Sequence, residues 1–189
     1  MSARLAHRWL KVRAIACLLF GRHARADEIF DLMLARWPDD AYALASRAHR
    51  RAATGRRDEA IADAEALVRA HPGRAAADWF NLGFLLESAS RLDEAQAAFR
   101  QALALDPKLD RAWYGLGVTL IRLGRADDAL AAFERNTELQ PMSPYGWYQL
   151  ARLHADQRRA DQARRIIRHL KGFEPQVAAQ LERETGLAA

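Results

Sequence analysis

The side chains that most often carry chemistry in proteins are few in this 189-residue chain, and they are not grouped. Cys17 is the single cysteine, which excludes an internal disulfide and a cysteine-rich zinc site. The histidines lack the H-x3-H and H-E-x2-H spacings typical of metal sites: they are His7, His23, His49, His71, His154 and His169. We therefore expect no metal and no other cofactor.

Pairs of acidic residues are the remaining candidates for acid–base catalysis. Asp58–Glu59 and Asp127–Asp128 each fall where the pattern described below predicts the start of a helix. Carboxylates at that position are explained by the positive end of the helix dipole. The phosphate-binding loops G-x4-G-K-[ST] and G-x-G-x2-G are absent, and so is the G-x-S-x-G turn of serine hydrolases. The sequence therefore predicts a protein that is not an enzyme.

The composition is that of a folded protein, with half of the residues hydrophobic and 28% charged. The longest apolar run, AIACLLF at residues 14–20, is too short to span a bilayer. Residues 1–26 combine basic residues, this short run and an Ala-x-Ala sequence, so an alternative is that they act as an export signal. Because they also fit the repeat below, we expect a cytoplasmic protein.

Prolines reveal an internal repeat that organises the whole chain. Pro38, Pro72, Pro107, Pro141 and Pro175 are separated by 34, 35, 34 and 34 residues. Aligning the chain on this spacing gives one array over residues 1–189 with five units: 7–40, 41–74, 76–109, 110–143 and 144–177. Proline cannot continue a helix interior, so we expect it to mark the turn between units.

Other positions of the unit also have a physical reading. Apolar residues recur at three- and four-residue steps on both sides of position 15, which predicts two amphipathic helices per unit. Position 15 is Gly21, Gly55, Ser90, Gly124 and Arg158, and glycine there suits the left-handed conformation that ends a helix. Position 8 is always small and position 20 is always alanine, which lets two helices approach closely. Acidic residues at position 18 are expected to cap or charge-stabilise the second helix: Asp58, Asp93, Asp127 and Asp161.

The pattern resembles the tetratricopeptide repeat family, whose 34-residue unit reads W-x2-L-G-x2-Y…A-x3-F…P. The third unit carries Trp79, Leu82, Gly83, Ala95, Phe99 and Pro107, and the fourth carries Trp113, Leu116, Gly117, Ala129, Phe133 and Pro141. This resemblance implies an all-α fold, a right-handed α-solenoid of five helical hairpins. Residues 175–186 are predicted to form a C-terminal capping helix with Val177, Ala178 and Leu181 on one side.

The first two units depart from the family pattern. Arg13 and Arg47 occupy position 7, where the family has leucine, so the packing of the helices there is open. Trp9 occupies position 3, which in later units faces the preceding unit. Either residues 1–6 or its own hairpin cover Trp9, or it serves self-association or docking.

The resemblance also implies where a partner binds, because positions 2, 5, 6, 9, 12 and 13 of the first helices line a concave groove in this family. Carried over residue by residue, these positions predict a partner-binding set: Phe80, Asn81, Phe84, Arg111, Tyr114, Val118, Arg122, Tyr145, Tyr148, Gln149 and Arg152. Aromatic and arginine side chains dominate binding energy at many interfaces. The alternative is that these side chains pack on one another.

The sequence thus predicts a non-enzymatic scaffold, adaptor or chaperone-like module that binds a peptide or protein surface of another protein. A second hypothesis starts from the net charge of +5. In it, a basic repeat protein binds RNA or an anionic surface through arginines such as Arg50, Arg51, Arg56 and Arg57 and those of the fifth unit. No aromatic residues alternate with these arginines, so nucleic acid is not the partner we expect.

Overall fold

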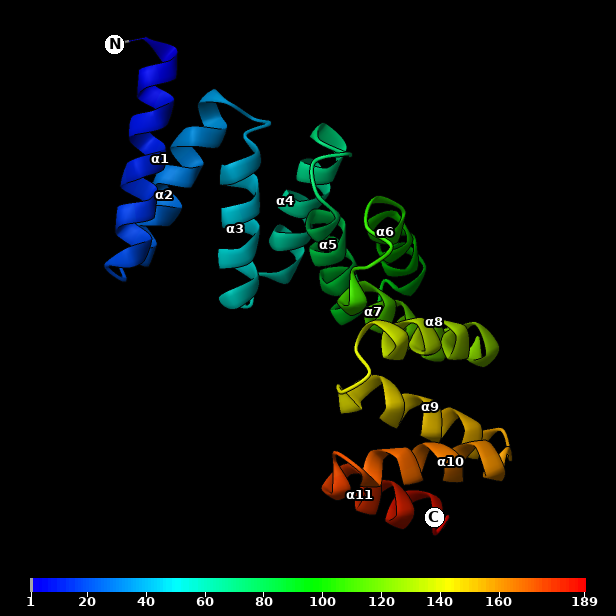
Figure 1. Ribbon diagram of the computed structural model, residues 1–189. Coiled ribbons are helices and arrows are strands. Elements are labelled where there is room, and N and C mark those ends of the chain that lie inside the picture. The colour runs from blue at the N-terminus through cyan, green and yellow to red at the C-terminus, as the bar shows by residue number, and fades with distance from the viewer. Residues whose placement is uncertain (1) are drawn as a thin grey trace. The chain divides into compact units, whose positions relative to one another are not determined.

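The computed structural model describes residues 2–189, and over this range its regular elements are all α-helices (Figure 1). The first helices of the five repeats are α1 (Ala3–Leu19), α3 (Ala41–Ala53), α5 (Ala76–Ser88), α7 (Asp110–Arg122) and α9 (Pro144–Asp156). The second helices are α2 (His23–Arg36), α4 (Arg57–Ala70), α6 (Leu92–Leu105), α8 (Ala126–Leu139) and α10 (Ala160–Lys171), and α11 (Pro175–Thr185) follows them. The helix α1 begins at Ala3, four residues before the first predicted unit.

The helices form two compact units, of which the first ends at Ser90 and the second comprises Arg91–Ala189. In the first unit α1 packs on α2 and α3 packs on α4, while α2 contacts α3 and α4 contacts α5. In the second unit α7 packs on α8 and α9 packs on α10, while α6 contacts α7 and α8 contacts α9. Within their units α3, α7 and α9 are therefore each held between two second helices.

The turn between the two helices of a repeat uses the left-handed backbone conformation at position 15. The backbone φ angle lies between 59° and 79° at Gly21, Gly55, Ser90, Gly124 and Arg158. The predicted conformation is thus present even where the residue is not glycine. Ser90 and Arg158 are strained there, because a Cβ atom disfavours positive φ.

The small residues at positions 8 and 20 lie at the points where helices approach most closely. The alanines at position 20 are completely buried: Ala26, Ala60, Ala95, Ala129 and Ala163. At position 8, a Cβ atom built on Gly117 would lie 2.6 Å from the ring of Phe133 on α8. Larger side chains at these positions would have to push the helices apart.

At the start of the second helices, the acidic residues take the second of their two predicted roles, stabilisation by charge. Asp58, Asp93 and Asp127 lie in the first turn, where their charge favours the helix dipole, but they do not cap the helix. The residue at the cap position is an arginine, and its side chain makes no capping hydrogen bond to the helix backbone. In α4, α6 and α8 it pairs instead with the acidic residue three positions later: Arg56–Glu59, Arg91–Glu94 and Arg125–Asp128.

The arginines at position 7 are accommodated in two ways. Arg47 stands where the family has leucine. Its Nε and Nη2 donate to the two carboxylate oxygens of Asp63 on α4, at 2.9 and 2.7 Å. Arg51 donates to the same carboxylate at 2.7 Å, and the Asp63 side chain is almost fully buried. Arg13 lies over the ring of Trp9, 4.3 Å from its centroid.

The two ends of the described chain differ in how well their apolar faces are covered. At the C-terminal end α11 packs on α10 and α9 with Ala178 and Leu181 completely buried, as the capping prediction requires. At the N-terminal end Trp9 is 52% exposed. Residues 3–6 belong to α1 and continue it along its axis, so they do not fold over the ring. The ring is thus partly covered, as its own hairpin was expected to cover it, and about half of it stays exposed.

Candidate protein-binding surfaces

A hollow of about 540 Å³ lies between α3 and α5 in the first unit, and we call it the α3/α5 hollow. Its floor consists of small side chains, because α3 carries alanine at successive positions on the side that faces α5: Ala45, Ala48, Ala52 and Ala53. Phe80, Asn81 and Phe84 line it from α5, so the structure brings together the three residues predicted on this helix. The alanines leave the space that larger side chains would fill.

The α3/α5 hollow is apolar with a polar rim. His49 and Asn81 are exposed at its edge, and Phe84 is 58% exposed. Asp78 also lines the hollow, but Arg74 donates from Nε to its carboxylate at 2.8 Å. The hollow therefore offers apolar contact and neutral hydrogen-bonding groups, with its one carboxylate already neutralised.

In the second unit, predicted residues on α7 and α9 form a second surface, the α7/α9 face. Tyr114 packs edge-on against Phe133 at 5.6 Å between ring centroids and lies 6.4 Å from Tyr145. Gln149 Nε2 donates to the hydroxyl oxygen of Tyr114 at 3.4 Å. Tyr114 is half-buried by these contacts, whereas Tyr145 is 69% exposed. Tyr114 thus supports the face, and Tyr145 is its most accessible aromatic ring.

The capping helix engages one edge of the α7/α9 face. The hydroxyl of Tyr148 donates to Oε2 of Glu184 on α11 at 2.6 Å, and Arg152 approaches the same carboxylate at 3.5 Å. The hydrogen bond from Tyr148, with a second from Gln180, lowers the pKa of Glu184 below its usual value. Two predicted partner-binding residues are therefore held by a carboxylate of the chain itself.

The other predicted residues on α7 are Arg111, Val118 and Arg122. Arg111 and Arg122 are exposed near opposite ends of the helix, and Val118 is half-buried between them. They lie along the same helix as Tyr114 and extend the face lengthwise. The alternative that the groove residues pack on one another describes Tyr114, which contacts Tyr145 and Gln149, while most of Tyr145 stays exposed.

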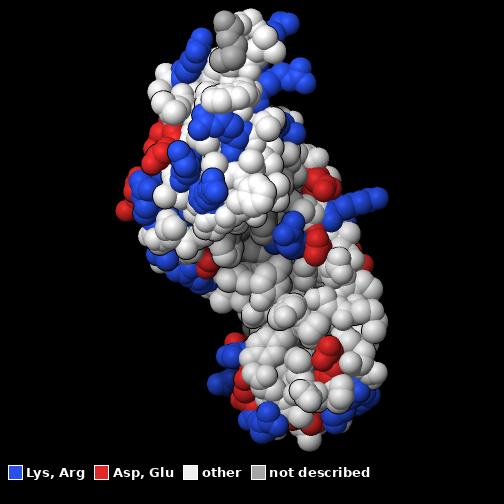
Figure 2. Space-filling model, turned by 90° about the vertical axis from the view of Figure 1, so that its left-hand side faces the viewer, with Lys and Arg blue, Asp and Glu red and all other residues white. Residues whose placement is uncertain are grey.

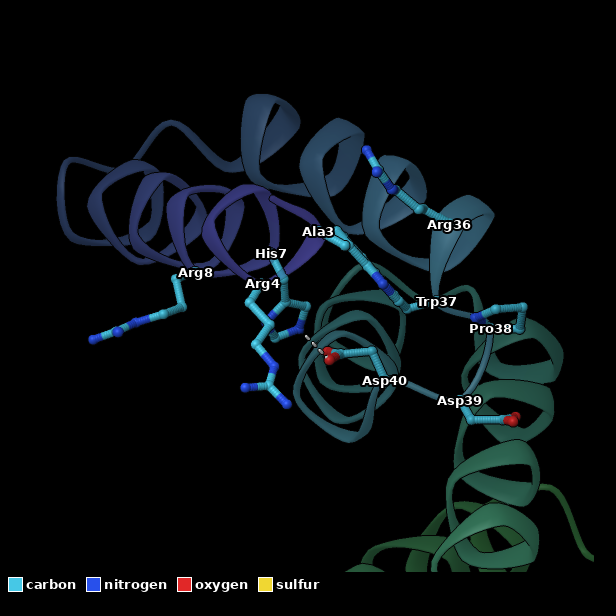
Figure 3. A pocket seen from close by; sticks show the side chains of 9 residues that line it. All are labelled: Ala3, Arg4, His7, Arg8, Arg36, Trp37, Pro38, Asp39 and Asp40. Carbon is cyan, nitrogen blue, oxygen red and sulfur yellow. Dashed lines mark hydrogen bonds and ion pairs between the residues drawn. The ribbon is translucent and has the colours of Figure 1, made fainter. Parts of the chain in front are cut away.

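A second hollow, at the start of the first hairpin, contains a histidine–aspartate pair (Figure 3). His7 Nε2 lies 2.6 Å from Oδ2 of Asp40, and the His7 ring meets Trp37 edge-on at 4.9 Å. Asp40 Oδ1 also accepts from the backbone N–H of Ala43 and so caps α3. No serine, threonine or cysteine lines this hollow, so the pair fastens α1 to the start of α3 and has no nucleophile to activate.

Carboxylates of the chain already neutralise much of the arginine charge on which the second hypothesis depends. Arg50 donates to both oxygens of Asp27, Arg51 to Asp63, and Arg56 pairs with Glu59. In the fifth repeat, ion pairs at 3.7 Å or less join Arg159 to Asp127, Arg164 to Asp161 and Lys171 to Glu182. These pairs weaken the case for a polyanion-binding surface.

Among residues 2–189, no group of three or more histidine, cysteine, aspartate or glutamate side chains is arranged to hold a metal ion. In the same range no helix is both long enough and apolar enough to cross a membrane. Cys17 is half-buried and packs against the core of the first hairpin.

Sequence reasoning missed two features of these surfaces. The floor of the α3/α5 hollow is made of alanines, which only the run of small residues at 43–53 could have indicated. The pairing of His7 with Asp40 joins residues 33 apart, about one repeat length, and nothing in either residue type signals it.

Comparisons with known proteins identify the repeat. Two family models, both described as tetratricopeptide repeat, match residues 46–108 and 86–148. No curated protein matches the chain. The all-α solenoid fold expected from the sequence is confirmed by solved structures that share it.

Three of these structures illustrate the likeness. The crystal structure of MamA is 17% identical, covers 95% of this chain and 93% of its own, and superposes with a TM-score of 0.79. YrrB, described as a tetratricopeptide repeat protein with an unusual peptide-binding site, is 20% identical over 90% of this chain and 88% of its own, with a TM-score of 0.80. A tetratricopeptide repeat protein from Parabacteroides merdae is 18% identical over 96% of this chain and 74% of its own, with a TM-score of 0.82.

Proposed function

Since this chain belongs to the tetratricopeptide repeat family, and is thus a protein–protein interaction scaffold, we propose that it binds a peptide segment or protein surface through the α3/α5 hollow and the α7/α9 face. Binding of a partner in this way requires no chemical step. The protein then acts as an adaptor without catalytic activity.

The observation that carries the proposal is the exposure of Phe84 beside a hollow floored by alanines. A phenylalanine that is 58% exposed next to an apolar cavity of about 540 Å³ leaves both the ring and the cavity in contact with water. Removing such a surface from water is favourable, and the volume lies within the range of typical ligand pockets. A bulky apolar side chain of a partner fits the cavity, with His49 and Asn81 placed to hydrogen-bond its backbone.

The α7/α9 face supports the same proposal with different side chains. Tyr145 and Arg152 are exposed, and tyrosine and arginine are the residue types most often found at binding hot spots. Tyr145 is held from below by Tyr114, which lowers the entropy that the ring loses on binding. YrrB, a similar structure, is described as having a peptide-binding site, which fits the class of ligand proposed here.

The experiment compares what the wild-type chain and three variants retain from an extract of the cells that produce it, using mass spectrometry. Phe84→Ser and Tyr145→Ser each remove one exposed ring, and Met142→Ser removes an equally exposed apolar side chain outside both surfaces. We expect one or more partners to be lost with Phe84→Ser or Tyr145→Ser and retained by Met142→Ser. If all four proteins retain the same partners, neither surface is the binding site.

A cytoplasmic location belongs to the same proposal. Residues 3–36 form the first hairpin, and Ala14 and Ala26 are completely buried within it. Cleavage after residue 26 would remove α1 and uncover the apolar side of α2. Mass spectrometry of the intact protein from its own cells tests this, because an exported and processed chain would lack these residues.

A further inference from the structure

The first helix, α1, is apolar on two opposite sides. One side, with Ala6, Ala14 and Leu10, packs into the first hairpin. The other side carries Leu5, Trp9, Val12 and Leu19, which are between 52% and 79% exposed. A helix of a soluble protein normally turns charged and polar side chains outward, and one that is apolar all round is normally buried. The outer side of α1 therefore has the character of a surface that another molecule covers.

The spacing of the exposed residues indicates what kind of molecule covers them. Leu5, Trp9, Val12, Ala16 and Leu19 follow one another at steps of four and three residues, and we call them the α1 stripe. This is the repeat of a narrow seam that packs against another α-helix. At a rise of 1.5 Å per residue, the seam is roughly 21 Å long.

The later repeats show directly that a helix lies against this side. Position 3, which is Trp9 in the first repeat, is buried in each of the others: Ala43, Asp78, Ala112 and Gly146. A Cβ atom on Gly146 would lie 2.3 Å from Oδ1 of Asn136 on α8, so the preceding second helix is in direct contact there. Among residues 2–189 no helix takes this place on α1.

Trp9 argues against a second copy of this chain stacked there as one more repeat. The contact at Gly146 has no room for a Cβ atom, and an indole at the same position would keep the incoming helix too far away for that packing. The C-terminal end argues in the same direction. There α11 already packs on α10, so the last second helix is not free to take the missing place on α1 of another copy.

The charges along α1 specify the partner more closely. The helix has no acidic residue, while Arg4, Arg8 and Lys11 follow one edge of the α1 stripe and Arg13 the other. Within the described range Arg4 and Arg8 are exposed and have no carboxylate partner. Figure 2, which views the side on which α1 lies in Figure 1, shows Lys and Arg gathered around uncharged surface at this end. Basic residues near a helix N-terminus oppose the helix dipole, and acidic groups of a partner would relieve that cost.

We propose that the α1 stripe docks an amphipathic helix of another protein, one that carries a narrow apolar seam bordered by aspartate or glutamate. The site is separate from the α3/α5 hollow and from the α7/α9 face, so a partner at either of those surfaces is not needed for it. An anionic membrane is the main competing occupant, because Ile15 and Phe20 are also exposed and widen the apolar side near the end of α1, and it has a readout of its own below.

The test uses two synthetic peptides of about 21 residues, three heptads that share one leucine seam and differ only in carrying Glu or Lys along its borders. Binding to the full chain is measured by calorimetry at concentrations where each peptide is monomeric. We expect the Glu-bordered peptide to bind and the Lys-bordered peptide to bind at least about tenfold more weakly. Equal affinities, or no binding of either peptide, would overturn the proposal.

Variants locate the binding and separate the remaining occupants. Trp9→Ser with Val12→Ser should weaken the Glu-bordered peptide by about tenfold or more, and Arg4→Glu with Arg8→Glu should reverse the preference between the peptides. Met142→Ser, Phe84→Ser and Tyr145→Ser should leave it unchanged, which keeps this site distinct from the proposed groove. Since every altered residue is exposed, circular dichroism should show all variants folded.

Two further measurements give the competing occupants their own readouts. Sedimentation with phosphatidylserine vesicles tests a membrane. A membrane would be favoured if the chain binds the vesicles, if the Trp9 and Val12 changes abolish this binding, and if neither peptide binds. Analytical ultracentrifugation would favour a second copy if the mass of the wild-type chain exceeds that of a monomer and the mass of Trp9→Ser equals it. Either result would replace the acidic helix as the occupant of the α1 stripe.

Discussion

The indole N–H of Trp113 donates to the backbone carbonyl of Pro107 at 2.9 Å, which ties the start of α7 to the turn that precedes it. The same bond recurs from Trp79 to Pro72 at 2.8 Å and from Trp147 to Pro141 at 2.9 Å. Proline frees this carbonyl because it ends the second helix, and the tryptophan of the next repeat supplies the missing donor. The tryptophan and the proline that mark the repeat in the sequence are thus hydrogen-bonded to each other across the boundary between two repeats.

Replacing Trp113 by Phe should remove this bond and leave most of the ring packing in place. We expect the free energy of unfolding to fall by about 1 kcal/mol, the usual net value of one hydrogen bond. Urea unfolding followed by circular dichroism measures the change. Trp9→Phe is the matched control, because Trp9 has an exposed ring, and it should cost less than Trp113→Phe. Equal losses would mean that ring size, and not the bond, is what matters at Trp113.

The parts of the fold that could be predicted are those set by sterics within one repeat. Alanine at position 20 and a left-handed residue at position 15 follow from the close approach of two helices and from the turn between them. Ser90 and Arg158 adopt the left-handed conformation although their Cβ atoms disfavour it. The repeat therefore imposes this conformation through its neighbours even where no glycine stands to adopt it.

Arg158→Gly should accordingly stabilise the second unit. Removing the Cβ atom relieves left-handed strain of about 1 kcal/mol, from which the extra freedom of glycine in the unfolded chain subtracts a few tenths. Thermal unfolding of Arg158→Gly beside wild type measures the gain. The reciprocal change, Gly124→Ala, places a Cβ atom in the same conformation and should lower the melting temperature. A loss of stability in Arg158→Gly would show that its side chain contributes more than the strain it brings.

Contacts between residues far apart in the sequence could not be predicted, because neither residue type indicates which partner it will meet. Tyr148 and Glu184 are 36 residues apart, and their hydrogen bond depends on where α11 lies. Arg47 was visible as a departure from the family leucine, but nothing identified Asp63 as its partner. The residues of the candidate surfaces on α5, α7 and α9 could be predicted one by one. Which of them are exposed, as Phe84 and Tyr145 are, and which are half-buried, as Tyr114 is, depends on how the helices pack and could not be predicted.

The Arg47–Asp63–Arg51 cluster should be the most sensitive polar feature of the first unit. Asp63→Asn keeps the size of the side chain but leaves two arginines, each half-buried, without their shared carboxylate. Breaking a buried pair on one side costs about 3 kcal/mol, so we expect a loss of this order in chemical unfolding. Glu138→Gln breaks the exposed pair with Arg135 and should cost less than about 1 kcal/mol. Similar losses from both changes would mean that water screens the inner cluster as it does the outer pair.

His154 should make the free energy of unfolding of the second unit depend on pH. Burial lowers the pKa of His154, the nearby charge of Arg159 lowers it further, and Glu134 opposes them only in part. The folded protein therefore favours the neutral ring, and its Nδ1 is buried without a hydrogen-bond partner. Because the unfolded chain takes up a proton near pH 6.5, this contribution is fully present above that pH and is lost as the pH falls towards the lower folded value. The loss should stay under about 1 kcal/mol, since solvent reaches the ring and screens its charge.

The measurement compares urea unfolding of wild type and His154→Leu at about pH 7.5 and about pH 5.5, on either side of the ordinary histidine pKa. Wild type should lose more stability than His154→Leu between the two, because leucine fills the site and takes up no proton. His23→Gln alters an exposed histidine and should keep the wild-type pH dependence. A wild-type slope in His154→Leu would assign the acid sensitivity to another group.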